Sequence, residues 1–186
     1  MKKNLLISLR LTIVLVVLLG LLYPLLIAAV GKLTPGEGNG EKVVADNKVV
    51  GYKLIGQSFT GDRYFWGRPS AVNYNAAGSG GSNKGPSNPD YLQQVKDRID
   101  SFLVHNPGVQ RSDIPAELVT ASGSGLDPDI SPAGAFIQVK RVAIARQLSE
   151  TVIKQLVEKQ VRKPLAGLGP EKVNVLQLNI ALDQLK

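Results

Sequence analysis

The most strongly apolar stretch of the chain runs from Leu11 to Val30 and carries no charge. Twenty helical residues rise about 30 Å, which matches the thickness of a bilayer's hydrocarbon core. A buried helix of a soluble protein would show a polar stripe along one side, and this stretch shows none. The pattern therefore predicts one transmembrane helix over residues 11–30.

The charges that flank this helix are asymmetric. Lys2, Lys3 and Arg10 precede it, and only Lys32 lies close behind it. Because positive flanks stay in the cytoplasm, residues 1–10 are predicted to be cytoplasmic and the rest extracytoplasmic. A cleaved signal peptide is the alternative, but its apolar core is usually about 7–15 residues long and ends in an A-x-A-like site. Here the core is longer and Ala28-Ala29 is the nearest approach to such a site, so we expect an uncleaved anchor.

Short apolar, β-prone runs follow the anchor. Val43-Val44 and Val49–Ile55 are predicted to be two strands, with a turn signal at Asp46-Asn47 between them. The aromatic run from Arg63 to Arg68 is predicted to be a strand or the end of one. At the other end of the chain, the segment VNVLQLNIALD alternates apolar and polar positions, with Leu176, Leu178, Ile180 and Leu182 on one side. That alternation is typical of a strand with one buried face.

Two polar stretches interrupt the pattern. In Asn73–Pro89, 13 of 17 residues are Gly, Ser, Asn or Pro, so this stretch cannot bury an apolar face. It is predicted to be a loop, either a disordered insert or a binding loop. The stretch Ala121–Ser131 is predicted to be a second loop, and Gly167–Pro170 a turn.

Helix signals follow both loops. Asn88-Pro89 and Ser131-Pro132 each place a capping residue before a proline, and Ser149 is predicted to cap the chain again. The first helix is expected to end at Asn106-Pro107-Gly108. Apolar residues recur at helical spacing after the three caps: Leu92, Val95, Ile99 and Phe102; Phe136, Val139, Val142 and Ala143; Val152, Ile153, Leu156 and Val157.

The pattern as a whole predicts a single-pass membrane protein with a mixed α/β (α+β) extracytoplasmic domain. Its parts are a cytoplasmic tail over residues 1–10, a transmembrane helix over 11–30, a Gly/Pro-containing linker over 31–41 and the domain over 42–186. The expected location is the cell (inner) membrane, with the domain in the periplasm or its equivalent. The strand order within the domain is not readable from the sequence.

Composition narrows the chemistry. The chain has no cysteine, which excludes disulfides, thiolate metal sites and cysteine nucleophiles. The net charge is +7, and the part contributed by the domain is spread without a Lys/Arg run. Nucleic-acid binding would need a concentrated basic patch, so a solvated basic surface is the better interpretation and no nucleic-acid partner is expected.

Catalytic motifs are hard to find. His105 is the only histidine and sits beside a predicted helix end, which suits a surface or capping role better than a Ser-His-Asp arrangement. Gly80–Gly85 has the glycine spacing of a P-loop, but Pro86 stands where the lysine belongs. Asp127 and Asp129 alone make a poor calcium loop. We therefore predict no catalytic residue and no metal-binding residue on this chain.

The membrane helix has one feature beyond its length. Pro24 lacks an N–H, so the carbonyl of Gly20 loses its helical partner, and such a group is normally satisfied by local adjustment or a neighbouring helix. Gly20 also permits close helix approach. Gly20 and Pro24 are therefore candidates for packing in a larger membrane complex, and the alternative is a simple anchor with a tolerated kink.

Several stretches, in order, coincide with one protein family. They include GLLYPL in the anchor, LIGQSF and YFWGRPSA after it, SGGSNKGPSNP and VTASGSGLDPDISP in the two loops, and the closing VNVLQLNIALD. On these residues, and on Gln138, Arg141 and Arg146 between them, the chain resembles the C subunit of the Kdp-type high-affinity potassium-transporting P-type ATPase. The match covers nearly the whole chain.

The resemblance implies a non-catalytic accessory subunit needed for assembly and activity of an ATP-driven potassium pump. The implied partners are a channel-like potassium-binding membrane subunit, an ATP-hydrolysing P-type subunit, a very small membrane subunit and the bilayer. The complex would use ATP, Mg and K, with none bound directly to this chain. The family's C subunit is also described as a catalytic chaperone that raises the ATP affinity of the hydrolysing subunit. Since ATP is cytoplasmic, that role would have to act through the membrane helices.

Two groups of candidate residues follow from the resemblance and the loops. Gln138, Arg141 and Arg146 are candidates for coupling; the two arginines lie five apart, so they should point in different directions, with at least one solvated or bonded locally. Tyr64, Phe65 and Trp66 are interpreted as packing groups rather than a cation cage. The polar loops suit close backbone approach and are candidates for partner contact: Ser79, Gly80, Gly81, Asn83, Gly85, Pro86, Ser122, Gly123, Ser124, Gly125, Asp127 and Pro128.

Two alternatives stay open from the sequence. An anchored module that binds an extracytoplasmic ligand outside any pump would purify alone, and Gly20 and Pro24 would be replaceable in it. An anchored hydrolase would require His105 or a carboxylate pair, so loss of activity on replacing His105 would support this alternative.

Overall fold

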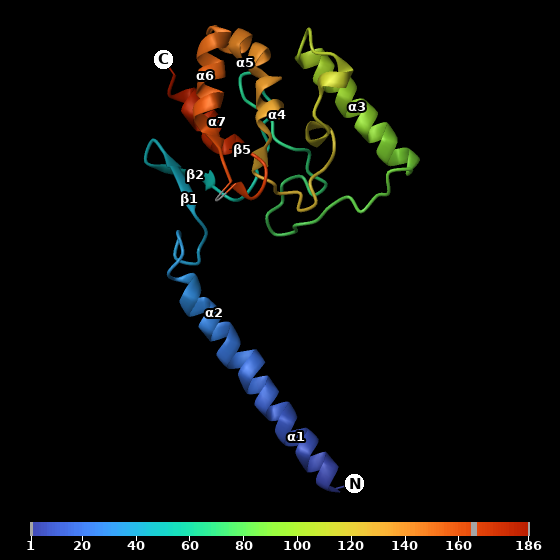
Figure 1. Ribbon diagram of the computed structural model, residues 1–186, viewed down its shortest axis with the longest axis vertical. Helices are drawn as coiled ribbons and strands as arrows, with labels where there is room; N and C mark the ends of the chain where they lie inside the picture. The colour runs from blue at the N-terminus through green and yellow to red at the C-terminus, as the bar shows by residue number, and fades with distance from the viewer. Residues whose placement is uncertain (1, 165–166, 186) are drawn as a thin grey trace. The chain divides into compact units, whose positions relative to one another are not determined.

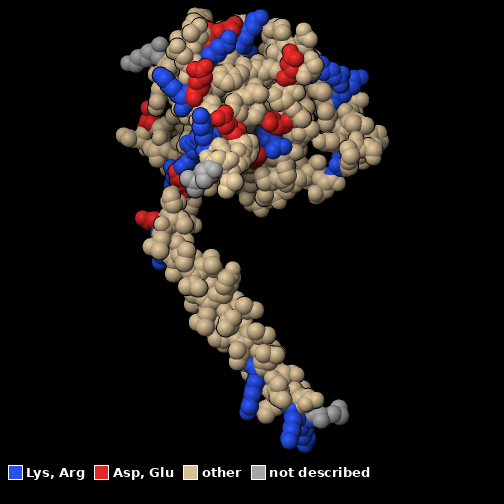
Figure 2. Space-filling view, viewed as in Figure 1, with Lys and Arg blue, Asp and Glu red and all other residues tan. Residues whose placement is uncertain are grey.

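The computed structural model describes residues 2–164 and 167–185, which divide into two compact units, residues up to 42 and the remainder. The first unit consists of one helix from Lys2 to Gly31, long and apolar enough to cross a membrane, and the turns that follow it. Figure 2 shows most of this helix without charged residues, with lysine and arginine gathered at its N-terminal end. This helix extends beyond the predicted span of residues 11–30 and includes the charged residues that precede it.

The helix changes geometry in its middle. It consists of α1 (Lys2–Val17), a π-helical turn (Leu18–Leu22) and α2 (Tyr23–Gly31). The Tyr23 N–H donates to the carbonyl of Leu18, five residues back, directly before Pro24. A π turn of this kind is one local adjustment that re-satisfies backbone groups disturbed by a proline.

The second unit begins with a hairpin. β1 (Lys42–Ala45) and β2 (Lys48–Tyr52) form a two-stranded sheet. Asp46 and Asn47 join them, both with positive φ (48° and 59°), as the tight turn that suits the twist of a hairpin requires. The predicted strands and turn are confirmed, although β2 ends at Tyr52 rather than at Ile55.

The core of this unit is formed by helices around a small antiparallel sheet. β5 (Lys172–Asn174) is the central strand, between β3 (Asp129–Ile130) and β4 (Val161–Arg162). In register, Ile130 and Val161 both face Val173. Four helices lie together beside the sheet, as Figure 1 shows: α4 (Pro132–Phe136), α5 (Val139–Arg146), α6 (Glu150–Gln160) and α7 (Val175–Asp183). α6 packs against α4, α5 and α7.

The predicted caps are confirmed. The side chains of Asn88, Ser131 and Ser149 each accept a hydrogen bond from a main-chain N–H of the first helical turn. The first of them begins α3 (Pro89–His105), which is followed by two 3-10 turns, Arg111–Asp113 and Ala116–Leu118. Only Phe102 of α3 is buried, Val95 and Ile99 are half-buried, and Leu92 is 53% exposed, so the predicted apolar face of this helix is covered only in part by this chain.

The predicted C-terminal strand is wrong beyond its first residues. Asn174 ends β5, and its side chain accepts from the Gln177 N–H, so the chain turns into α7. The buried positions of α7 include Val175, Leu178, Asn179 and Leu182, which follow helical spacing. The leucines of this segment also alternate, which is the pattern of a strand. The Asn174 cap favours the helix over the strand.

The predicted strand over Arg63–Arg68 is also wrong, since these residues form no ladder with a neighbouring strand. The segment nevertheless crosses the core, and Phe65 is fully buried. Side chains from other elements satisfy its main-chain polar groups. That arrangement is the centre of the candidate site.

Candidate functional site

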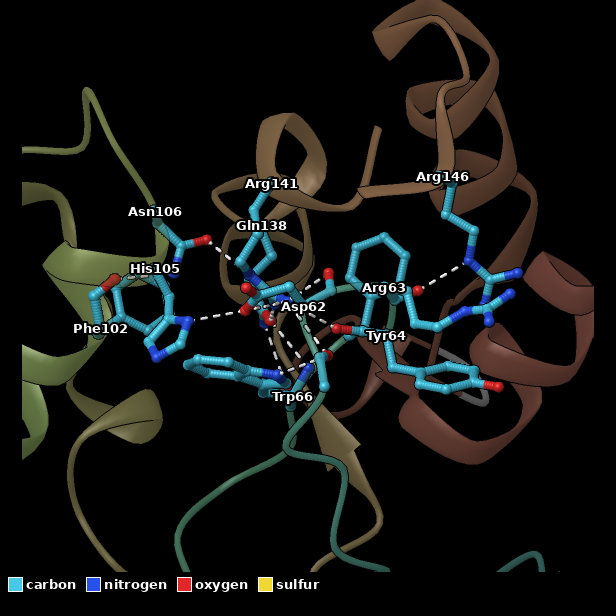
Figure 3. Close-up of polar contacts among 12 residues, drawn as sticks. Asp62, Arg63, Tyr64, Trp66, Phe102, His105, Asn106, Gln138, Arg141 and Arg146 are labelled. Atoms are coloured by element: carbon cyan, nitrogen blue, oxygen red, sulfur yellow. Dashed lines mark hydrogen bonds and ion pairs between the residues drawn. The ribbon is translucent and has the colours of Figure 1, made fainter. Parts of the chain in front are cut away.

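Six consecutive main-chain carbonyls, from Gly61 to Trp66, each accept a hydrogen bond from a side chain. Figure 3 shows how Gln138, Arg141 and Arg146 lie around this segment. An irregular segment in a protein interior must satisfy its carbonyls in some way, and a strand does so by pairing. Here the indole of Trp66 reaches back to Gly61, and the remaining donors come from α5, from α7 and from the turn between α4 and α5. They are Arg141, Arg146, Asn179 and Gln138.

Arg141 makes the largest number of these contacts. Its guanidinium donates to the carbonyls of Asp62 (2.7 Å) and Tyr64 (3.0 Å) and to the side-chain oxygens of Asn106 (3.1 Å) and Gln138 (2.7 Å). The side chain is 3% exposed. A planar guanidinium offers five donors in a fixed fork, which is why one residue can hold partners on several elements.

The charge of Arg141 is balanced by its surroundings. Its guanidinium lies 4.2 Å from the centre of the Trp66 ring and 3.8 Å from the Asp62 carboxylate. Burial lowers the pKa of Arg141 to about 10, and the Asp62 carboxylate acts in the opposite direction. The group is therefore charged at neutral pH, which makes it a fixed positive charge inside the domain.

Two side-chain amides replace the missing strand partner. The Gln138 side chain accepts from the Trp66 N–H (2.8 Å) and donates to the Trp66 carbonyl (3.1 Å). Asn179 does the same for Phe65, accepting from its N–H at 2.8 Å and donating to its carbonyl at 3.0 Å. Gln138 is fully buried, and Asn179 is 2% exposed. Each amide thus imitates one step of a β-ladder.

Arg146 holds the same segment from the other side. It donates to the Arg63 carbonyl (2.8 Å) and to Asp183 of α7 (2.7 Å), and its guanidinium lies 4.9 Å from the centre of the Tyr64 ring. The two arginines do point in different directions, but both are bonded to residues far away in the sequence. The expectation that at least one would be solvated or bonded only locally was wrong. The structure brings Gln138, Arg141 and Arg146 together on one segment.

The three aromatic residues pack as interpreted from the sequence. Phe65 lies in the core, and Trp66 contacts the ring of Phe102 edge-on at 6.2 Å. The cations beside Tyr64 and Trp66 are this chain's own arginines. These rings therefore stabilise the domain rather than form an open cage.

His105 is the last residue of α3 and lies at the edge of this cluster. Its Nδ1 is 2.7 Å from a carboxylate oxygen of Asp62, its ring meets the Trp66 ring edge-on at 5.0 Å, and its side chain is 39% exposed. Over residues 2–164 and 167–185, no serine or threonine hydroxyl forms a hydrogen bond with this ring. A histidine at a helix C-terminus next to a carboxylate suits a local structural role.

A cavity of about 500 Å³ opens beside His105. Trp66, Phe59 and Phe102 supply its apolar walls, and Arg98 and Tyr74 its polar groups. The Tyr74 hydroxyl donates to the Arg68 carbonyl at 2.5 Å, and burial raises the pKa of this phenol. In the part of the chain that the structure describes, no group of three or more His, Asp or Glu side chains is placed to hold a metal ion.

The two predicted loops lie against each other. The Gly80 N–H and the Ser79 hydroxyl both donate to the carbonyl of Ser124, at 2.8 and 3.0 Å. Gly125 has a φ of 67°, and a Cβ on it would stand 2.8 Å from the Gly80 carbonyl. A side chain on Gly81 would stand 3.0 Å from the Gly123 carbonyl. The close backbone approach that the glycines permit is therefore used within the chain.

The remaining loop candidates divide into an inner and an outer group. Ser122 is buried and donates from its N–H to the Pro69 carbonyl, Asp127 pairs with Arg68 at 2.9 Å, and the Pro128 carbonyl accepts from the Val175 N–H. The outer group is exposed and consists of Asn83, Gly85, Pro86 and Gly123. Whether any of them contacts a partner stays a prediction.

Sequence reasoning missed three residues of the cluster, Asp62, Asn106 and Asn179. Asn179 was assigned to a wet strand face, although helical spacing from Val175 would have placed it inside. Asn106 was read only as a helix stop, yet it is 2% exposed and bonds Arg141. No local pattern marks Asp62, whose role depends on contacts with residues 43 and 79 positions away.

Comparisons with known proteins cover both units of the chain. A family model described as "KdpC: K+-transporting ATPase, c chain" matches residues 5–184. A protein of Flavobacterium johnsoniae is 58% identical over 184 residues, which is 99% of this chain and all of the relative. A protein of Bacteroides fragilis is 52% identical over 188 residues (99% and 98%), and one of Caldanaerobacter subterraneus is 49% identical over 177 residues (94% and 92%). Each of these relatives carries the name "Potassium-transporting ATPase KdpC subunit".

Proposed function

This chain belongs to the KdpC family, the c chain of the K+-transporting ATPase, and on that premise we propose that it is a non-catalytic subunit required for assembly and activity of an ATP-driven potassium uptake pump. The observation that carries the proposal is the extent of the match. It includes the membrane helix as well as the domain, so the whole chain is the unit that is shared with the relatives.

The topology belongs to the same proposal. The N-terminal tail lies in the cytoplasm, the helix crosses the cell membrane once, and the domain lies outside. The asymmetry of Lys2, Lys3 and Arg10 against Lys32 supports this orientation. The orientation can be tested by introducing one cysteine at an exposed position of the loop, for example Ser87→Cys, and treating the cells with a membrane-impermeant thiol reagent. The chain has no other cysteine, so only this position can be labelled. Labelling in intact spheroplasts supports the orientation, and labelling only after lysis contradicts it.

The partners follow from the pump. A channel-like potassium-binding subunit, an ATP-hydrolysing P-type subunit and a very small membrane subunit would accompany this chain, and the complex would use ATP, Mg and K. The exposed tip of the loop, Asn83 to Pro86, and Gly123 beside it are the candidates for contact with the channel-like subunit. The domain holds these loops together by its own hydrogen bonds, which would present them as one preformed surface.

Gln138, Arg141 and Arg146 support the pump indirectly. They hold the segment Gly61–Trp66 inside the domain, so their role is to position rather than to touch potassium or ATP. An effect of this subunit on ATP affinity would be a coupling between the outer domain and a cytoplasmic site, transmitted through membrane helices.

The experiment that tests the proposal is purification of the tagged chain in mild detergent from its own host grown at low potassium. Recovery of a channel-like subunit and a P-type ATPase subunit in fixed ratio supports it. Recovery of the chain alone, from cells shown to express those subunits, removes it and favours the anchored ligand-binding module. The ATPase activity of the complex, with and without this chain, then measures its contribution.

A further inference from the structure

Tyr23 places a hydroxyl in the most apolar part of the chain. From Leu11 to Val30 only Thr12, close to the charged end, and Tyr23 carry side chains with hydrogen-bonding atoms. Tyrosine is normally found where a membrane meets water, because its hydroxyl can then stay hydrated. A tyrosine well inside a transmembrane stretch therefore calls for an explanation.

The depth of Tyr23 follows from helix geometry. The helix is continuous from Lys2 to Gly31, so at about 1.5 Å per residue Tyr23 lies about 20 Å from Arg10 and about 14 Å from Lys32. Side chains of a helix lean toward its N-terminus. The phenol of Tyr23 thus leans toward the middle of the apolar stretch, away from the nearer boundary at Lys32, and cannot reach water by extending outward.

The hydroxyl has no partner within the described chain, and the Tyr23 side chain is 57% exposed. Ser8, in the same helix, solves this problem locally, because its short hydroxyl donates to the Asn4 carbonyl at 2.9 Å. The para-hydroxyl of a tyrosine lies beyond the backbone of its own turn and cannot do so. Lipid tails offer no acceptor either, so the partner must come from another protein segment.

The backbone around Tyr23 suits a close neighbour. Leu18–Leu22 form the π turn, Pro24 removes an N–H directly after Tyr23, and a Cβ on Gly20 would have no atom within 4 Å beyond its chain neighbours and the backbone of its own helix. A small residue one turn from a widened, proline-disturbed backbone leaves room for a second helix to approach. The Tyr23 hydroxyl and the uncovered helix surface at Gly20 therefore lie close together along the helix.

We propose that the Tyr23 hydroxyl donates a hydrogen bond to an acceptor on a transmembrane helix of another pump subunit, which packs against the turn from Gly20 to Pro24. The acceptor is a side-chain amide or carboxylate oxygen at mid-membrane depth. A second copy of this chain is the poorer partner, because residues 11–30 carry no amide or carboxylate side chain, and two facing phenols would leave one hydroxyl without an acceptor. The inference rests on the proposed function, since it requires the helix to be in the membrane beside other subunits.

The test compares Tyr23→Phe with Leu25→Ala in the full complex. Phenylalanine keeps the ring and removes only the hydroxyl, and Leu25, two residues further along α2, points to the opposite side of the helix. After purification in mild detergent, the complex is challenged with a harsher detergent and the fraction that retains this chain is measured. Tyr23→Phe is expected to lower the apparent association constant by about threefold to tenfold, in keeping with interhelical hydrogen bonds in membranes. Leu25→Ala is expected to leave it within about twofold of the original.

A photoreactive phenylalanine analogue at position 23 identifies the neighbour in the same complex. Crosslinking to a transmembrane segment of another subunit supports the proposal. Crosslinking to a second copy of this chain or to lipid alone overturns it, as does a Tyr23→Phe complex as stable as the original. If the other subunits co-purify while these results are negative, only this inference fails. If they do not co-purify at all, the proposed function fails with it.

Discussion

The Gln138 side chain forms two hydrogen bonds with the main chain of Trp66, accepting from its N–H at 2.8 Å and donating to its carbonyl at 3.1 Å. The same amide also donates to the Gly134 carbonyl and accepts from Arg141. All four bonds lie inside the domain, because Gln138 is fully buried. One side chain therefore supports a turn between two helices, an irregular segment and a buried charge.

Replacing Gln138 with leucine is expected to lower the free energy of unfolding by about 2–6 kcal/mol. The apolar side chain has a similar size, but the Trp66 N–H and one Arg141 N–H would lose their buried acceptor, and each unsatisfied group costs about 1–3 kcal/mol. Denaturant unfolding of the detergent-solubilised chain, followed by Trp66 fluorescence, measures the change. Gln155→Leu, on the exposed side of α6, is the matched control and should shift the midpoint little. Equal stability of the two variants would contradict the structural role of Gln138.

Gly125 and Gly123 differ in what an added methyl group would meet. Gly125 has a φ of 67° and its Cβ would stand 2.6 Å from a Val72 methyl group, whereas Gly123 has open space. Gly125→Ala is therefore expected to lower the free energy of unfolding by about 1–3 kcal/mol and to speed hydrogen exchange of the Gly80 amide, which donates across the two loops. Gly123→Ala should do neither. If Gly123→Ala nonetheless weakens co-purification with the pump subunits, the exposed loop surface contacts a partner.

Tyr74 makes the stability of the domain sensitive to alkaline pH. Burial raises the pKa of its phenol above the ordinary value of 10.0, so above that pH the folded chain holds this proton more strongly than the unfolded chain. The stability contributed by the protonated Tyr74 phenol is fully present below pH 10 and falls as the pH rises through the pKa of the folded chain. Tyr74→Phe should lose about 1 kcal/mol at neutral pH, through the bond to the Arg68 carbonyl, and should show a smaller further loss at alkaline pH. Tyr52→Phe, in the exposed hairpin, serves as control, and parallel pH profiles for Tyr74→Phe and the original chain would contradict the assignment.

His105→Ala is expected to leave potassium-limited growth nearly unchanged. The ring is 39% exposed and its described polar contact is with Asp62, whose main-chain carbonyl keeps its bond to Arg141 in the variant. Growth rate at limiting potassium, with the level of the chain in the membrane checked by blotting, is the measurement. Loss of growth at a normal level of the chain would favour a catalytic histidine and count against a non-catalytic subunit.

The elements that could be predicted from the sequence are those with a local cause. The elements in question are the uncharged residues 11–30 within α1 and α2, the Asn88 and Ser131 caps followed by proline, and the Asp46-Asn47 turn. Each carries its signal in its own residues. The helix α7 was missed because its leucines also alternate, although the Asn174 cap and the helical spacing of the buried residues Val175, Leu178, Asn179 and Leu182 both indicate a helix.

The candidate cluster was predictable only in part. Gln138, Arg141 and Arg146 were identified by resemblance, but their common target was not, because the segment Gly61–Trp66 takes its hydrogen-bond partners from positions up to 114 residues away. No periodicity encodes such pairing. The aromatic run Arg63–Arg68 therefore has the sequence pattern of a strand. Its main chain is paired by the side chains of Gln138 and Asn179, which the sequence does not reveal.

The distance between Phe65 and Asn179 also has a consequence for biosynthesis. A ribosome adds about 5–20 residues each second, so the 114 residues that separate the two partners take about 6–23 s to make. For that time the Phe65 backbone has emerged without its amide clamp, and its ring has no finished interior to enter. The nascent domain therefore stays open until its last helix is made, and truncation before α7 would leave an apolar segment exposed to chaperones and proteases.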